Sequence, residues 1–134
     1  MTFVVDASIA TCWLMPDEND PRAAAAYDRI SENDAVAPAI WWFEVRNVIA
    51  MNERRGRINV EEADDACAFA TRLPVLIDRE PNEAAMMTLA RRHRLTVYDA
   101  AYLELALRRS APLATLDAAL TRAANAEGVT LIGA

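Results

Sequence analysis

The sequence contains no lysine. All 14 basic residues are arginines, and 20 acidic residues bring the net charge to −6. This composition is unusual for a nucleic-acid-binding protein, because affinity for phosphate groups usually comes from a basic surface. Arginine does bind phosphate through two parallel hydrogen bonds, but the codon bias of a GC-rich genome explains an all-arginine composition more simply. Composition alone therefore predicts an acidic globular domain and names no ligand.

Cysteine, histidine and long apolar runs are also scarce. Cys12 and Cys67 are too few for a disulfide framework and match no metal-ligand spacing, so we expect reduced thiols in the core. His93, the only histidine, lies in an arginine-rich stretch, and we expect it on the surface near a helix end rather than as a general base. No apolar run approaches the length of a membrane span, and the N-terminus lacks the basic segment of a signal peptide. We therefore predict a cytoplasmic protein without a membrane segment.

Short apolar segments alternate with helical patterns along the 134 residues, a length typical of one domain. Strands are expected at residues 3–5, 35–37, 75–77, 112–115 and 129–132. Helices are expected between them, ending near 14 and then over about 20–32, 39–55, 59–72, 81–93, 99–109 and 117–126. This alternation predicts an α/β fold with a parallel sheet covered on both faces.

Carboxylates follow the expected strands. In parallel sheets, ligands bind beyond the carboxyl ends of the strands. Asp6 directly follows the apolar run 3–5, and Asp117 follows the next-to-last strand in the same way. Each of these residues could instead simply cap the next helix. Asp78 also follows an apolar strand, but a turn or cap role before Pro81 explains it.

Two further acids lie on expected helices. Glu44 is inside the long helix 39–55, so it caps nothing, and its face carries mostly apolar residues together with Asn47. Glutamate is seldom fully buried unless it is paired or bound to a metal. The alternative is a boundary residue with its head in solvent, paired to Arg54 or Arg46. Asp99 begins the next-to-last helix, where capping is again an alternative.

Convergence of these four acids would require a compensating charge. Two like charges about 4 Å apart repel by roughly 4 kcal/mol at an effective dielectric near 20. The chain has no lysine to neutralise them, and a hard divalent cation with oxygen ligands is the usual solution. Mg²⁺ or Mn²⁺ held by carboxylates can activate water and stabilise a leaving oxygen in phosphodiester cleavage. The acids therefore predict a site for Mg²⁺ (or Mn²⁺).

Four segments of the sequence together resemble a known family. FVVDAS, PAIWWFEVRNVI, TVYDAAYLELA and LATLDAAL occur in the order and with the spacing of PIN-domain proteins, and the chain is similar to the VapC-type toxin ribonucleases of toxin–antitoxin pairs. The resemblance spans nearly the whole chain. It implies a single PIN-like domain over residues 1–134, a three-layer sandwich with a central parallel sheet of about five strands covered by helices.

The resemblance also implies an activity, a cofactor and a set of site residues. The expected activity is that of a metal-dependent endoribonuclease, which hydrolyses RNA phosphodiesters with carboxylate-bound Mg²⁺ or Mn²⁺. The resemblance implies four residues that are both catalytic and metal ligands: Asp6, Glu44, Asp99 and Asp117. It implies three polar residues that support these ligands through hydrogen bonds: Ser8, Asn47 and Thr115.

The expected partners are the RNA substrate, a cognate antitoxin protein and a second copy of the chain. VapC-type toxins typically dimerise and bind an antitoxin segment across a hydrophobic groove. Trp41 lies near the Glu44 side of its helix, whereas Trp42 points roughly opposite and must meet another helix, a second subunit or a partner. Arginine clusters at 54–57 and 91–94 could contact backbone phosphates, or could be solvated helix ends favoured by the helix dipole.

The sequence disfavours two other functions of small α/β domains. A receiver domain needs a strand-end lysine, which the chain lacks. A phosphatase of the haloacid dehalogenase type would carry a second aspartate two residues after the first, where this chain has Ser8. Two alternatives stay open: a catalytically silent PIN-like binding protein, and a non-toxin PIN nuclease that acts in RNA processing.

Overall fold

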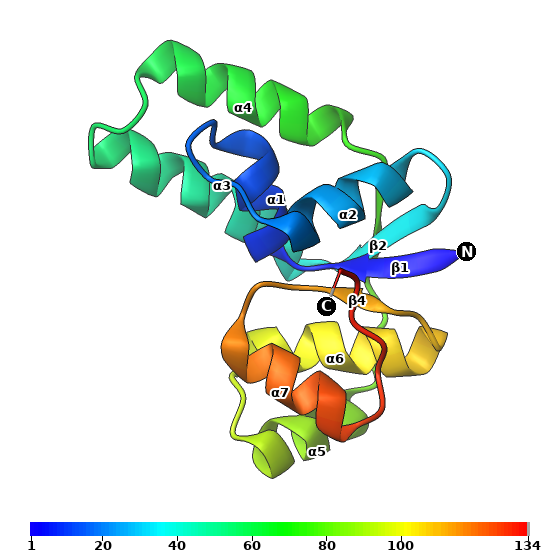
Figure 1. Ribbon diagram of the computed structural model, residues 1–134. Helices are drawn as coiled ribbons and strands as arrows, with labels where there is room; N and C mark the ends of the chain where they lie inside the picture. The colour runs from blue at the N-terminus through cyan, green and yellow to red at the C-terminus, as the bar shows by residue number, and fades with distance from the viewer. Residues whose placement is uncertain (134) are drawn as a thin grey trace.

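A computed structural model describes residues 1–133 and places helices on both faces of a parallel sheet (Figure 1). The four strands are β1 (Thr2–Val5), β2 (Asp34–Pro38), β3 (Val75–Asp78) and β4 (Leu113–Ala114). They lie in the order β3-β2-β1-β4, and every pairing is parallel. The predicted α/β fold is thus confirmed.

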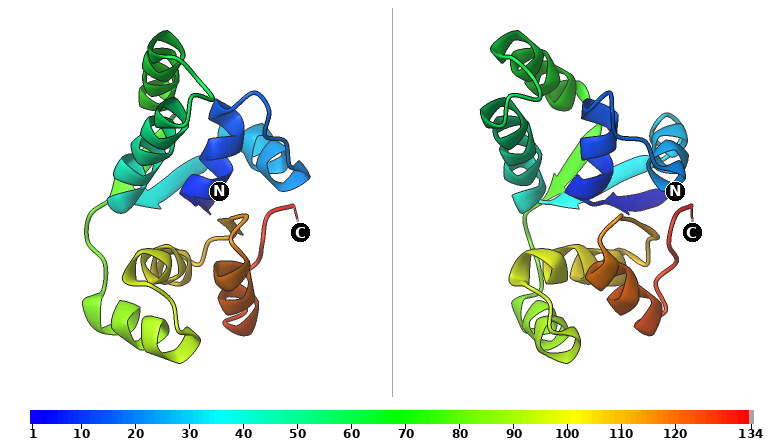
Figure 2. Two further views of the ribbon diagram at one scale, coloured as in Figure 1. Left: turned by 90° about the vertical axis from the view of Figure 1, so that its left-hand side faces the viewer. Right: turned by 60° about the vertical axis from the view of Figure 1, so that its left-hand side comes forward.

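Seven helices cover the sheet in the described residues. They are α1 (Ala7–Leu14), α2 (Pro21–Ile30), α3 (Ile40–Arg54), α4 (Val60–Arg72), α5 (Glu83–His93), α6 (Val97–Arg109) and α7 (Ala118–Ala126). The first four lie on one side of the sheet and the last three on the other, as the turned views confirm (Figure 2). Within residues 1–133, none of these helices combines the length and apolar character needed to cross a bilayer.

The expected count of about five strands is too high by one. Segment 129–132 forms only a single parallel bridge, between Leu113 and Leu131. Two hydrogen bonds hold it: the amide of Leu113 donates to Thr130 (2.9 Å), and the amide of Ile132 donates to the carbonyl of Leu113 (3.0 Å). The strand β4 has only two residues, and only one of them, Leu113, pairs with segment 129–132. One pair of residues does not form the continuous hydrogen-bond ladder that defines a strand pairing.

Local sequence signals set most helix ends. Asn59 and Glu62 form the expected capping box, in which each side chain accepts a hydrogen bond from the other residue's backbone amide. Asp20 caps α2 ahead of Pro21, also as expected. The predicted start of α5 at Pro81 is wrong by two residues. The helix begins at Glu83 because the preceding Asn82 accepts the first-turn amide of Ala85 at 3.0 Å.

The centre of the sheet is fully buried. Phe3, Val4 and Val5 of β1 are at most 1% exposed, as expected for a strand with helices on both faces. Cys12 and Cys67 are free thiols that pack against this core. The carboxyl ends of β1 and β2 lead directly into α1 and α3, and α6 begins at the same end of the sheet (Figure 1). Residues at these junctions are therefore brought to one edge.

Candidate active site

An open cavity of about 480 Å³ lies where the strands end. The structure brings all four predicted acids together on its walls: Asp6, Glu44, Asp99 and Asp117. Ser8 and Asn47 line it too, while Thr115 lies behind the wall against Asp6. We call this cavity, with its four acids, the acidic pocket.

Asp6 occupies the N-cap position of α1, but its side chain makes no capping hydrogen bond, so capping does not explain it. The residue is only 5% exposed. Two hydroxyl groups, from Ser8 and Thr115, each donate a 2.7 Å hydrogen bond to its Oδ2 atom. These bonds hold the carboxylate in one orientation.

The same hydroxyl groups connect Asp6 to the segment after β4. Ser8 Oγ accepts the amide of Leu116, and Thr115 Oγ1 accepts the amide of Asp117, both at 3.0 Å. Asp117 also caps α7, since its Oδ2 accepts the amide of Leu120 at 2.8 Å. The prediction that Asp117 caps the next helix is therefore confirmed. The same residue also lines the pocket.

Glu44 reaches the pocket from the middle of α3 and lies one turn before Asn47. Its Oε1 accepts a hydrogen bond of 2.6 Å from the hydroxyl of Tyr102. The alternative of pairing to arginine is wrong within residues 1–133: Arg46 stacks on the Trp42 ring at 4.1 Å, and Arg54 forms no ion pair with Glu44. Glu44 is thus a pocket acid without a cationic partner among these residues.

Asp99 lies in the first turn of α6 rather than at its start. The capping alternative is wrong here, because Thr96 is the N-cap and its Oγ1 accepts the amide of Asp99 at 3.1 Å. The Asp99 carboxylate is left to line the pocket.

The environment of the pocket disfavours ionised carboxylates. Burial raises the pKa of Asp6, and the negative charge of Asp117 adds to this, although the hydrogen bonds from Ser8 and Thr115 oppose it. Burial likewise raises the pKa of Glu44 and of Asp99, and neighbouring carboxylates push both further upward. None of the four acids forms an ion pair with arginine or histidine in the described part of the chain. The pocket therefore favours a cation.

The donor set fits a hard divalent ion in an open site. Across residues 1–133, no group of three or more His, Cys, Asp or Glu side chains is arranged so that it could hold a metal ion. Mg²⁺ does not require one, because it usually keeps several waters and takes only one or two carboxylates together with substrate phosphates. Carboxylate oxygens around a cavity of about 480 Å³ leave room for those waters and for a phosphate.

Sequence reasoning missed one acid of the pocket wall. Glu18 lies in the loop between α1 and α2 and lines the same cavity. Arg57 links this loop to α3. Its side chain donates hydrogen bonds to Asp17 (2.6 Å) and Glu18 (3.4 Å) in the loop and to Asn52 (2.7 Å) in α3. No local pattern could have indicated Glu18, because its partner Arg57 lies 39 residues further along the chain.

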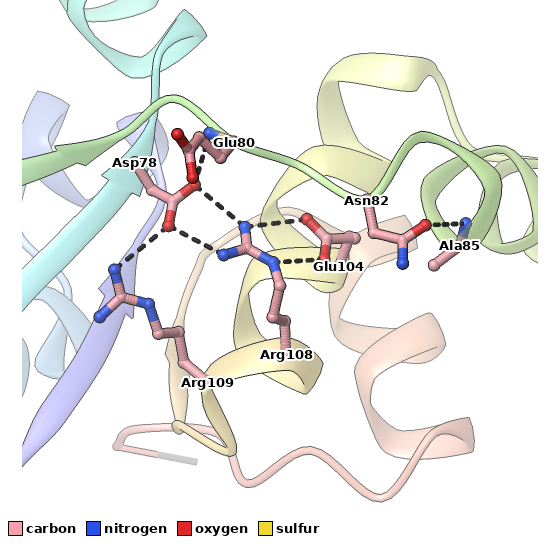
Figure 3. A network of polar contacts seen from close by, with 7 residues as sticks. All are labelled: Asp78, Glu80, Asn82, Ala85, Glu104, Arg108 and Arg109. Atoms are coloured by element: carbon pink, nitrogen blue, oxygen red, sulfur yellow. Dashed lines mark hydrogen bonds and ion pairs between the residues drawn. The ribbon is translucent and has the colours of Figure 1, made fainter.

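Asp78 is not among the residues that line the pocket, as predicted. It belongs instead to a network of polar contacts with Glu80, Arg108 and Arg109 (Figure 3). Its Oδ1 accepts the amide of Glu80 at 3.0 Å, which confirms the turn role. Arg108 bridges Asp78 and Glu104 with four hydrogen bonds of 2.7–3.1 Å, and Arg109 adds a further bond to Asp78. The hydrogen bonds from Arg108 hold the pKa of Asp78 well below its usual range. A buried carboxylate outside the pocket is thus neutralised by arginine.

His93 is the last residue of α5 and does not line the pocket. The expected position near a helix end is confirmed, but the side chain is partly enclosed, at 14% exposure. The reason is a partner on α7's C-terminal side: Nε2 lies 2.6 Å from Glu127, which also accepts a 2.7 Å bond from Arg92. In each of the two arginine clusters, one residue thus forms ion pairs with acids of this chain: Arg92 with Glu127, and Arg57 with Asp17 and Glu18.

Comparison with known proteins identifies the family. The sequence profile of the PIN domain matches residues 3–126. The chain belongs to the PIN-domain family. It is 34% identical over 121 residues to Ribonuclease VapC3 from Pyrobaculum aerophilum, and the match covers 87% of this chain and 90% of that protein.

Several solved structures share the fold. PAE2754 from Pyrobaculum aerophilum superposes with a TM-score of 0.72 at 22% identity, over 92% of this chain and 84% of that one. FitAcB from Neisseria gonorrhoeae gives 0.69 at 20% identity, over 98% and 96% of the two chains. VapC20 from Mycobacterium tuberculosis, described as a sarcin-ricin loop cleaving toxin, gives 0.61 at 16% identity, over 90% and 94%. These similarities confirm the predicted PIN-like fold.

Proposed function

We propose that this PIN-domain protein is a metal-dependent endoribonuclease that hydrolyses RNA phosphodiesters at the acidic pocket. The observation that carries the proposal is the convergence of four carboxylates, from four separate segments, on one open cavity without a paired cation among the described residues. The relatives support RNA as the substrate, since one is named a ribonuclease and another is described as cleaving the sarcin-ricin loop.

The pocket residues have distinct roles in this proposal. Asp6, Glu44 and Asp99 would hold Mg²⁺ or Mn²⁺, and Asp117 would complete the acidic set. When bound, such an ion supplies an activated water and neutralises charge on the phosphate oxygens. Asp6 is kept in one orientation by two hydroxyl donors, so its carboxylate needs little reordering to bind a cation.

Asn47 offers the pocket a neutral amide one turn from Glu44. Together with Ser8 and Thr115, it would support the ligands through hydrogen bonds, and such supporting groups typically change metal affinity 10–100-fold when removed. The half-open cavity leaves one side of the carboxylate cluster accessible to a phosphodiester.

We further propose that the protein is the toxin of a toxin–antitoxin pair and forms a homodimer. The VapC relatives and the similarity to FitAB, solved with a DNA fragment, support an antitoxin partner. Trp41 is buried, but Trp42 and Phe43 on the next positions of α3 are 48% and 64% exposed. Such adjacent exposed aromatics are typical of a surface that a partner or a second copy covers.

Purified protein tests the activity. It is expected to cleave structured RNA with Mg²⁺ or Mn²⁺ and to stop when EDTA is added. Asp6→Asn should lose cleavage while keeping its circular dichroism spectrum, and Asp78→Asn, which changes a buried acid outside the pocket, should keep cleavage. Full activity of Asp6→Asn would contradict the site assignment.

Expression of the chain in a host cell tests the biological role. A toxin should arrest growth, and the product of a small neighbouring gene should relieve the arrest. Cleavage without growth arrest would instead favour a nuclease of RNA processing, and the absence of cleavage would favour a silent binding protein.

A further inference from the structure

Tyr102 places a phenol group directly behind the acidic pocket. The residue is fully buried, at 0% exposure, and stands three positions after Asp99 on the same face of α6. Its hydroxyl donates the 2.6 Å hydrogen bond to Glu44. Burial, and after it the charge of Asp6, raises the pKa of Tyr102 far above its usual range, so the hydroxyl stays a donor.

This hydrogen bond joins two helices that lie on opposite faces of the sheet. Glu44 belongs to α3 in the upper layer of Figure 1, and Tyr102 belongs to α6 in the lower layer. Among residues 1–133, it is the only side-chain hydrogen bond or ion pair between α3 and α6. The helix α3 carries the proposed ligand Glu44, and α6 carries the proposed ligand Asp99. The hydrogen bond from Tyr102 therefore fixes the position of Glu44 relative to the helix that carries Asp99.

The choice of tyrosine at this position is informative. Phenylalanine would fill nearly the same volume without burying a hydroxyl, which is unfavourable unless the hydroxyl forms a hydrogen bond. Here the bond goes to a carboxylate, and charged acceptors make such bonds shorter and stronger. The enclosed ring cannot shift easily in a close-packed interior, so the donor position is fixed.

We infer that Tyr102 is a positioning residue that orients the Glu44 carboxylate and thereby sets the affinity of the acidic pocket for a divalent cation. The inference rests on the proposed metal-dependent function. Residues that orient a metal ligand typically change metal affinity 10–100-fold when they are removed. Tyr102→Phe is therefore expected to weaken binding at least about tenfold, although it touches no cation itself.

Calorimetric titration of the purified chain with Mn²⁺, without RNA, measures this directly. Tyr102→Phe should bind Mn²⁺ at least about tenfold more weakly than the wild type. Tyr27→Phe, the same chemical change at a half-exposed tyrosine of α2, should bind like the wild type. Leu103→Ala, which opens a cavity in the fully buried core of α6, should lose stability but keep its affinity.

These variants separate positioning from stability and from the proposed function itself. If Leu103→Ala weakens binding as much as Tyr102→Phe, the role of Tyr102 is merely structural and the inference is wrong. If Asp6→Asn abolishes Mn²⁺ binding but Tyr102→Phe leaves it unchanged, the metal site stands and only the inference falls. If the wild type does not bind Mn²⁺ at all, both fail.

A second measurement does not depend on a variant that folds. Wild-type protein labelled with 3-fluorotyrosine gives a ¹⁹F resonance for each of its three tyrosines. Addition of Mg²⁺ should shift the resonance of Tyr102, whose acceptor becomes a ligand, and leave that of Tyr27 in place. An unchanged Tyr102 resonance at saturating Mg²⁺ would overturn the inference.

Discussion

Replacement of Asp6 by asparagine should stabilise the metal-free protein, although it removes a proposed catalytic group. Asparagine has the same shape, and its carbonyl oxygen can still accept the hydrogen bonds from Ser8 and Thr115. What disappears is a buried negative charge that shares a cavity with three other carboxylates that form no ion pair in the described part of the chain, Glu44, Asp99 and Asp117. The structure offers this charge no arginine partner among residues 1–133.

The expected size follows from opposing effects. For a separation of roughly 8 Å, one carboxylate repels another by roughly 2 kcal/mol at an effective dielectric near 20, and solvent in the open cavity screens about half of the total for three such neighbours. Against this, the two hydroxyl hydrogen bonds each weaken by about 1 kcal/mol when their acceptor becomes neutral. The net stabilisation is about 1 kcal/mol, which raises Tm by about 3–5 °C for a domain of this size.

Thermal unfolding in EDTA and in Mn²⁺ tests this reasoning. A cation at a hundredfold excess over its Kd stabilises the wild type by about 2.7 kcal/mol, or about 10 °C in Tm. Asp6→Asn should lose most of that gain. The order of the two melting temperatures is therefore expected to reverse: the variant is more stable in EDTA, and the wild type is more stable in Mn²⁺.

Asp78→Asn is the matched control, because Asp78 is a buried carboxylate that arginine neutralises. Its loss breaks charge-assisted bonds to Arg108 and Arg109, so it should destabilise by about 1.5–3 kcal/mol both with and without Mn²⁺. If Asp6→Asn melts below the wild type in EDTA, the electrostatic account of the pocket is wrong.

Three further predictions concern pH, a helix cap and a loop. Since the folded-state pKa of Asp6 lies above its ordinary 3.8, the stability that this group contributes is present below pH 3.8 and is lost as the pH rises through the folded pKa; the advantage of Asp6→Asn in EDTA should thus shrink when chemical denaturation is measured at pH values lowered from about 7.5 towards 3.8, and an advantage that stays constant down to pH 3.8 would contradict the raised pKa. Asn59→Ala should lower the free energy of unfolding by about 1 kcal/mol through loss of the α4 capping box, and a change below about 0.3 kcal/mol would argue against it. Arg57→Ala should leave the Oδ1 atom of the buried Asn52 without its donor and speed hydrogen exchange in segment 15–20, and unchanged exchange there would show that the loop is held by other contacts.

Much of this architecture was predictable because its causes are local. The alternation of apolar strands with helical patterns indicated a covered parallel sheet, and the capping signals at Asp20 and Asn59 predicted helix starts that the structure confirms. The strand expected at 129–132 failed for a tertiary reason: its neighbour β4 is too short to sustain a ladder. The start of α5 was mispredicted although its cause is local: Asn82 rather than Pro81 caps the helix, because the Asn82 side chain reaches the free amide of Ala85.

By itself, the sequence determined where the four acids stand along the chain, since a carboxylate after a strand or on a helix face is a property of adjacent residues. Only the tertiary structure decided what each acid does. Asp6 meets Thr115 across 109 residues and Glu44 meets Tyr102 across 58, whereas Asp78 is turned to Arg108 and removed from the pocket. The physical reason is that charge pairing and desolvation depend on distances in space, and chain folding sets those distances between residues that no local pattern relates.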